Sequence, residues 1–184
     1  MTYSIKLDRF DEFARRFRQV GDGTGKIGRM IVAAMEAALI LVGDQIDVRT
    51  PVNIGALRGS RTSAVHGTSL HLIGEIVSPL AYGIVVEYGR LPGGRMPPVQ
   101  AILYWVKRKG IAGTFSASTG RRLGNQATRD KQDLAAAWAI ARHIAVHGTV
   151  GAFMYRDGIE AARPHVEKLW DDLVNDLLIE LAKP

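Results

Sequence analysis

The apolar pattern of residues 25–46 constrains the fold more than any other feature of the chain. Apolar side chains recur there at the spacing of one helix face, at Ile27, Met30, Ile31, Ala34, Met35, Ala38, Leu41 and Val42. Pro51 follows this segment and disfavours helix in the residue before it. The most apolar run, Ile31 to Val42, has twelve residues and contains Glu36. A membrane span needs about twenty apolar residues, so we expect a long helix in a soluble protein.

Two further helices are expected near the ends of the chain. Residues 157–182 carry an apolar stripe, and Pro164 is expected to kink or restart that helix. The stripe consists of Val166, Leu169, Trp170, Leu173, Leu177 and Leu178. An N-terminal helix is assigned to residues 1–20, where Ile5 to Gln19 place Phe10, Phe13 and Phe17 on one face. Arg15, Arg16 and Arg18 lie mostly off that face.

The middle of the chain alternates between strand and helix signals. Residues 61–66 and 70–78 read as two strands joined by a tight turn at Gly67-Thr68-Ser69, and Pro79 ends the second strand. The apolar run 80–88 fits either a helix or a strand. A helix is expected from Pro97-Pro98 to about Lys109. A further helix is expected from a cap at Asp130 or Asp133 to His147, followed by a strand over 149–154.

These elements predict one domain of the α+β class over residues 1–184. In this fold a small antiparallel sheet packs against N-terminal and C-terminal helices, and a long basic loop is inserted between two helices. The chain has no cysteine, which excludes disulfides, thiolate metal sites and a cysteine nucleophile. The N-terminal residues also lack the apolar core of a signal peptide, so we expect no targeting segment.

The positive charge of the chain is concentrated in one segment. The formal net charge is +6, and residues 107–131 contain seven Lys and Arg against one Asp. Gly, Ser, Thr and Asn dominate the rest of the segment, which predicts a flexible loop. Such a loop is expected to contact an acidic partner protein or nucleic acid. Its cations are Lys107, Arg108, Lys109, Arg121, Arg122, Arg129 and Lys131.

Three patterns invite a catalytic or cofactor interpretation, and each has a simpler one. Gly23 to Gly28 spells G-x-G-x-x-G, but a helix pattern rather than a strand precedes it, so a linker between helices is the better interpretation. His143 and His147 have a zinc-compatible spacing but lack a third ligand nearby, which favours ordinary surface histidines. Glu75 and Glu87 are interpreted as strand-edge or interface charges rather than an acid–base pair. We expect no enzymatic activity, no cofactor and no metal.

One stretch carries a family resemblance. The segment Thr50-Pro-Val-Asn-Ile-Gly-Ala-Leu-Arg-Gly-Ser60 precedes the hairpin, and Pro79-Leu-Ala-Tyr-Gly-Ile-Val-Val-Glu-Tyr-Gly-Arg90 follows it. Together they resemble the tail-completion (head–tail neck, minor tail) proteins of tailed bacteriophages and prophages. The matching residues are Pro51, Val52, Asn53, Gly55, Leu57, Arg58, Ser60, Tyr82, Glu87, Tyr88 and Gly89. Ile54 replaces the usual Thr, and Gly83 stands where Ala is common.

Later segments fit the same family in order. Pro97-Pro98 with Ile102 to Val106 resembles its "P-P…I-x-x-W" segment, and Ala139 to Thr149 resembles its "A-x-x-I-x-x-x-G-T" segment. Phe153 and Ala161-Ala162 resemble its C-terminal end, although Ala152 replaces the usual Pro. The resemblance thus covers about residues 39–178.

The resemblance implies a structural protein of the virion, made in the bacterial cytoplasm, that joins tail to head. It implies a ring of identical subunits, with a hexamer matching tail symmetry, beside connector and tail-tube proteins and with no membrane contact. In that role Pro51 and Gly55 are expected to form a tight turn and Leu57 to anchor it in the core. Whether the motif belongs to the core or to an interface is left open. In the interface case Tyr82 and Tyr88 would contact a neighbour, and Glu87 would pair with Arg58, Arg61 or Arg90.

The sequence leaves two other functions open. A tail terminator or another minor tail component has the same physical requirements and differs only in its position in the particle. A DNA-binding protein is a lesser alternative that depends on the basic segment, including transient contact with DNA in the lumen of the ring. Low aromatic content in that segment, with Phe115 alone, argues against stacking on single strands.

Overall fold

The computed structural model describes residues 25–68 and 71–182. The elements, in chain order, are α2 (Lys26–Arg49), α3 (Ala56–Gly59), β1 (Thr62–Thr68), β2 (His71–Val77), α4 (Tyr82–Tyr88), β3 (Gly89–Arg90), α5 (Val99–Lys109), α6 (Gln126–His147), β4 (Thr149–Val150) and α7 (Met154–Ala182). The strands form two separate antiparallel pairs, β1 with β2 and β3 with β4. The α+β class predicted from the sequence is confirmed. The N-terminal helix predicted over residues 1–20 lies outside the described residues.

The chain divides into two compact units. The terminal unit comprises the described residues up to Ala81 together with those from Phe153 onward, and the central unit comprises Tyr82–Ala152. The single domain expected from the sequence stays a prediction. No helix among the described residues is both long and apolar enough to cross a membrane.

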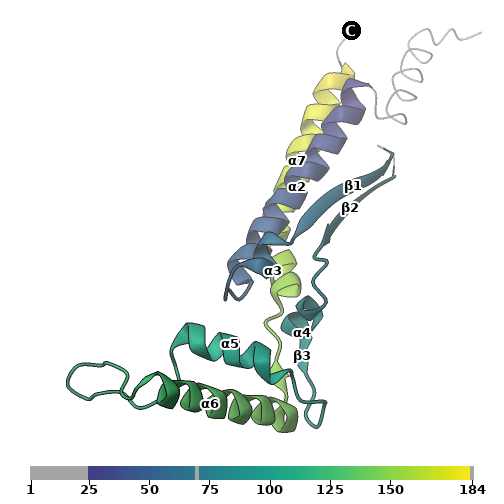
Figure 1. Cartoon of the computed structure of the whole chain (residues 1–184). Coiled ribbons are helices and arrows are strands. Elements are labelled where there is room, and N and C mark those ends of the chain that lie inside the picture. The colour runs from purple at the N-terminus through teal and green to yellow at the C-terminus, as the bar shows by residue number, and fades with distance from the viewer. Residues whose placement is uncertain (1–24, 69–70, 183–184) are drawn as a thin grey trace, which may run out of the picture. The chain divides into compact units, whose positions relative to one another are not determined.

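In the terminal unit, α2 and α7 pack side by side (Figure 1). Gly158 of α7 lies against the last turns of α2, where an added Cβ would come within 2.9 Å of the Ile46 backbone nitrogen. This close approach leaves Ile46, Met154 and Ala162 almost fully buried. The helix continues through Pro164, which neither ends nor restarts it. Of the predicted apolar stripe, Leu177 is half-buried but Leu178 is exposed, because adjacent helical residues point about 100° apart.

The β1–β2 hairpin lies beside α2 and confirms the strand pair predicted around residue 67 (Figure 1). Gly74 of β2 faces α2, since a Cβ there would press against the side chains of Met35 and Leu39. Side chains alternate between the two faces of a strand, so Ile73 and Val77 point to the opposite face, where they are exposed. The hairpin thus leaves a mixed face open, where Ile73 and Val77 lie on the same side as the His66–Glu75 ion pair.

In the central unit, α5 packs against α6 around a small core. Val106, Ala112 and Ala137 are buried there, and partly buried apolar residues pack against them, namely Val99, Ile102, Leu103, Trp105, Ala136 and Ile140. The apolar run at 80–88, which periodicity alone left unassigned, forms α4. The strand expected over 149–154 is restricted to Thr149–Val150, because α7 already begins at Met154.

Helix α6 begins earlier than predicted. Its cap is Asn125, whose side-chain oxygen accepts a hydrogen bond from the Thr128 backbone nitrogen at 2.9 Å. Asp130 and Asp133, the predicted caps, lie inside the helix and bond to other side chains. The predicted end at His147 before Gly148 is confirmed.

Candidate assembly surfaces

The first motif block forms the turn that follows α2. The hydroxyl of Thr50 donates to the Ile46 carbonyl at 2.7 Å and is buried, which closes the helix end. Gly55 has φ +80°, and no atom lies within 4 Å of a Cβ added there. The left-handed backbone conformation rather than crowding therefore accounts for this glycine. Leu57 is buried, as predicted for the anchor of the turn.

The same turn presents several of its motif side chains to solvent. Pro51 and Arg58 are exposed, as are the apolar side chains of Val52 and Ile54. Asn53 is half-buried, and its side-chain oxygen has no hydrogen-bond partner among the described residues. The first motif block thus combines a buried anchor with an exposed apolar rim.

An ion pair joins this turn to α2. The guanidinium of Arg61 donates to both carboxylate oxygens of Asp47, at 3.1 and 2.7 Å, and this hydrogen bonding raises the pKa of Arg61. The guanidinium lies over Gly43, where a Cβ would overlap it. Arg61 therefore has a partner within the chain, which argues against the predicted pairing with Glu87 of a neighbouring subunit.

The second motif block forms α4 and the start of β3. Tyr82, Ile84, Val85 and Tyr88 of α4 are exposed, Tyr88 by 71%. Glu87 is 95% buried, since its relative exposure is 5%. A buried carboxylate does not belong to a solvent-facing rim, so Glu87 does not fit the predicted role of an exposed interface charge. Tyr82 and Tyr88 are exposed, and their place in an interface stays a prediction.

Gly89 and the Gly148-Thr149 segment, which lie far apart in the sequence, meet in one strand pair. Gly89 lies opposite Val150 and Arg90 lies opposite Thr149. Gly89 has φ +77°, and a Cβ there would overlap the Thr149 carbonyl oxygen. Both the conformation and the space at this position require glycine. Two segments of the family resemblance are therefore structural partners.

The basic segment 107–131 is only partly a loop. Lys107, Arg108 and Lys109 end α5, and Arg129 and Lys131 lie in α6, so the connection itself spans residues 110–125. It folds into a small hairpin, with a bridge between Phe115 and Arg122. The long loop predicted from composition is therefore shorter by three residues at its start and by six at its end. Composition alone could not show that the first cations of the segment end α5 and that its last cations lie in α6.

Three of the seven cations are held within the chain. Arg122 donates to Asp133 Oδ1 at 2.7 Å, and the Asp133 side chain is 4% exposed. Arg122 and Arg129 also donate to each other's backbone carbonyls, each at 2.9 Å. Lys107 pairs with Asp130 at 2.7 Å. This hydrogen bond raises the pKa of Lys107 and lowers that of Asp130, to which Gln126 also donates.

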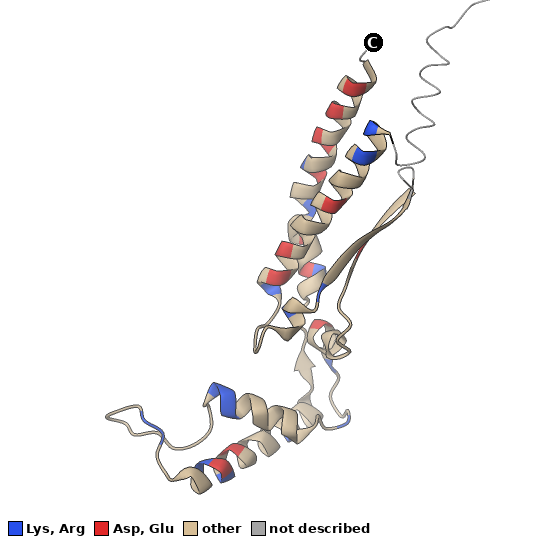
Figure 2. Cartoon of the chain, turned by 45° about the horizontal axis from the view of Figure 1, so that its top comes forward, with Lys and Arg blue, Asp and Glu red and all other residues tan. Residues whose placement is uncertain are grey.

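The other four cations of the segment are exposed, namely Arg108, Lys109, Arg121 and Lys131. Figure 2 shows blue positions gathered where α5 ends and α6 begins, on either side of the loop. Only these four therefore fit the predicted contact with an acidic partner or DNA. The other three primarily hold the loop and the two helices together.

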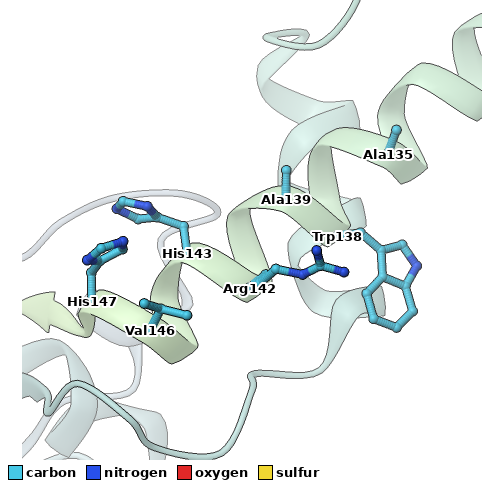
Figure 3. A pocket seen from close by; sticks show the side chains of 7 residues that line it. All are labelled: Ala135, Trp138, Ala139, Arg142, His143, Val146 and His147. Carbon is cyan, nitrogen blue, oxygen red and sulfur yellow. The ribbon is translucent and has the colours of Figure 1, made fainter.

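The outer face of α6 is an apolar hollow that the sequence analysis missed. Trp138, Arg142 and Val146 lie four residues apart along this face, beside Ala135, Ala139, His143 and His147 (Figure 3). Trp138 and Val146 are exposed. The i, i+4, i+8 spacing of Trp138, Arg142 and Val146 is the sequence signal that indicates this face.

The two histidines lie together at the end of this face. The ring centroids of His143 and His147 are 4.4 Å apart (Figure 3). No group of three potential ligands from His, Cys, Asp and Glu occurs within residues 25–68 and 71–182. The pair alone supplies two of the ligands that zinc requires.

No protein-family model, no curated protein and no solved structure matches this chain.

Proposed function

We propose that this protein is a structural virion component of a tailed phage or prophage, a tail-completion or neck protein that joins tail to head as a ring. The proposal rests on the resemblance of the motif residues between Pro51 and Ser60 and between Tyr82 and Gly89 to that family. The exposure of several of their side chains supports an assembly role. The proposed position of the protein in the particle comes from the resemblance alone.

The observation that best supports an assembly role is the exposed apolar surface of the second motif block. Ile84 and Tyr88 of α4 are 68% and 71% exposed, while the neighbouring Glu87 is buried. Leu91 and Val150, which follow β3 and end β4, are 85% and 92% exposed. Large apolar side chains exposed to this degree are typical of interaction sites, and tyrosine is enriched in interfaces. This surface supports contact with another protein more strongly than it supports catalysis.

A ring requires two different patches on each subunit that fit each other head to tail. The chain offers further exposed apolar surface on the outward face of β2, at Ile73 and Val77, and on the outer face of α6, at Trp138 and Val146. These surfaces provide the second patch that a closing interface needs. An open, non-closing contact would instead lead to filaments.

Particle analysis tests the function directly. Virions released after prophage induction in the source bacterium are purified and digested, and their peptides are identified by mass spectrometry. We expect this chain in intact particles and in isolated tails. Its absence from particles that contain portal and tail-tube proteins would overturn the proposal. Pull-down with portal-side and tube-side proteins then separates the neck role from a tail-terminator or other minor-tail role.

The exposed cations Arg108, Lys109, Arg121 and Lys131 favour one secondary role, contact with DNA in the ring lumen. Four phosphate contacts give a slope of log K against log salt of about −3.6. Filter binding across a salt series measures this slope. Replacing all four cations by glutamine should abolish it, and salt-independent or undetectable binding of the unaltered protein would exclude the DNA role.

A further inference from the structure

A groove runs between α2 and α7 in the terminal unit. Its floor is apolar, formed by Ala34 and Leu41 of α2 and by Leu169 and Leu173 of α7. Asp172 and Asp176 stand at its rim, beside His165 and Lys168. The β1–β2 hairpin packs on a different part of α2, at Met35 and Leu39. The hairpin therefore leaves the groove uncovered.

The chain contains a segment with the complementary pattern. Ile5 to Gln19 place Phe10, Phe13 and Phe17 at i, i+3 and i+7, the spacing at which a helix inserts side chains into an apolar groove. Fifteen helical residues would extend about 22 Å. The groove follows α7 from His165 to Asp176, a rise of about 17 Å. The predicted helix is long enough to cover it.

The connection to α2 determines the direction in which this segment would lie. Lys26, at the start of α2, pairs with Glu180 near the end of α7 at 2.7 Å. The described structure therefore begins beside the end of α7, and two of the residues that precede it in the sequence, Gly21 and Gly23, are of a type that suits a turn. A helix that turns back from this point would place Phe17 near Asp176, Phe13 near Leu173 and Phe10 near Leu169.

Charge favours the same orientation. Arg15, Arg16 and Arg18 are clustered at the end of the predicted helix that connects to α2. The corresponding end of α7 is acidic, with Asp171, Asp172, Asp176 and Glu180, and acidic positions follow this helix in Figure 2. Lys168 already pairs with Asp172 at 2.7 Å, and no ion pair joins Asp176 to another described residue. Asp176 therefore remains as the rim carboxylate that an arginine of the segment would pair with.

We propose that residues 5–19 of the same chain occupy the groove between α2 and α7 as a third helix, parallel to α7. The phenylalanines would cover Leu169 and Leu173, and the arginines would face Asp176. This arrangement reserves the groove for the chain's own N-terminal segment, so neighbouring subunits would have to bind elsewhere. The proposal does not depend on ring formation or on a place in the virion.

Cross-linking tests this proposal, because the natural chain contains no cysteine. Phe13→Cys is combined with Leu173→Cys or, to allow for register, with Leu169→Cys, and each full-length double variant is treated with a short bis-maleimide. Asp11→Cys with Leu173→Cys is the matched control, since Asp11 lies on the opposite face of the predicted helix. We expect about tenfold more intrachain cross-link from the Phe13 pairs than from the control, because docking raises the effective concentration of the two thiols.

Three results would overturn the proposal. Equal cross-linking of the Phe13 and Asp11 pairs would show that the segment is not docked by its phenylalanine face. A cross-link at twice the chain mass would show that a neighbouring copy fills the groove. Hydrogen exchange gives a second measure that does not depend on cysteine. Phe10→Ser/Phe13→Ser/Phe17→Ser should speed amide exchange over residues 165–176 but not over α5, and unchanged exchange would contradict the proposal.

Discussion

The guanidinium of Arg122 lies 2.7 Å from the Oδ1 atom of Asp133, eleven residues later in the chain, and links the loop to the first half of α6. A second guanidinium nitrogen of Arg122 donates to Oδ2 at 3.3 Å, so the interaction is bidentate, and the carboxylate is almost fully buried. Arg122 looked from the sequence like one of seven equivalent cations. The structure assigns it to the stability of the central unit.

Replacing Arg122 by methionine should therefore destabilise the protein strongly. The variant leaves the Asp133 carboxylate buried without its partner, and breaking a buried pair in this way costs about 3 kcal/mol or more in the free energy of unfolding. Urea unfolding followed by circular dichroism measures the difference. Arg121→Met is the matched control, since it removes the same charge from an exposed neighbour and should change stability by less than about 0.5 kcal/mol. Similar losses in the two variants would contradict the assigned role.

Substitutions at Gly89 and Gly93 can distinguish two costs to stability: that of a left-handed backbone conformation and that of overlap between an added Cβ and a neighbouring atom. Their φ values are +77° and +76°, but only at Gly89 would a Cβ overlap another atom, the Thr149 carbonyl oxygen. Gly93→Ala should cost about 1–2 kcal/mol for the left-handed conformation alone. Gly89→Ala should cost about 1–3 kcal/mol more, because β3 and β4 must move apart. Equal losses on urea unfolding would show that the strand pair is not closely packed.

The Lys107–Asp130 pair makes stability depend on pH in a defined direction. Asp130 has a lowered pKa when folded, so its contribution is present above the unfolded pKa and is lost as pH falls through the folded value. Lys107 has a raised pKa when folded, so its contribution is present below the unfolded pKa and is lost as pH rises through the folded value. The pair therefore contributes fully between about pH 4 and pH 10.

NMR titration of the Asp130 carboxyl tests this relationship. In Lys107→Met the pKa of Asp130 should rise toward its ordinary value, because the ammonium that donates to it has been removed. Lys109→Met, which removes a nearby cation with no contact to Asp130, should leave that pKa in place. An unchanged pKa in Lys107→Met would mean that the pair does not persist in solution.

The exposed face of α4 should be needed for assembly but not for folding. Ile84→Ser combined with Tyr88→Ser removes two exposed side chains, so the free energy of unfolding should change by less than about 1 kcal/mol. If these residues are central to an interface, subunit affinity should fall by at least about thirtyfold, the effect of losing a hot spot worth 2 kcal/mol. Sedimentation equilibrium measures this affinity. Tyr104→Ser on α5, also exposed, is the control and should assemble normally.

The sequence predicted well those elements whose signal is local. The long helix from residue 25, the β1–β2 hairpin and the helix after Pro98 all follow from spacing, turn residues and proline. Gly55 and Leu57 behave as the motif implied. Periodicity, caps and positive φ are properties of short segments, so one sequence is enough to recognise them.

What the sequence left undetermined depends on long-range contacts. Asp133 reads equally well as a helix cap and as a partner for an arginine, and only the fold of the loop decides between them. Glu87 reads as a surface charge within an apolar run, yet tertiary packing buries it. The pairing of Gly89 with Val150 joins residues too far apart in the chain for any local pattern to predict.

The mass of the protein in solution tests the central claim, that the subunits form a closed ring, most directly. Sedimentation velocity of the full-length chain should show, as concentration rises, one assembled species with a fixed number of subunits, six for a ring that matches tail symmetry. A heterologous interface that closes gives such an end point. A chain that stays at its monomer mass of 20.1 kDa at every concentration, or that grows into filaments without a fixed size, would contradict the account.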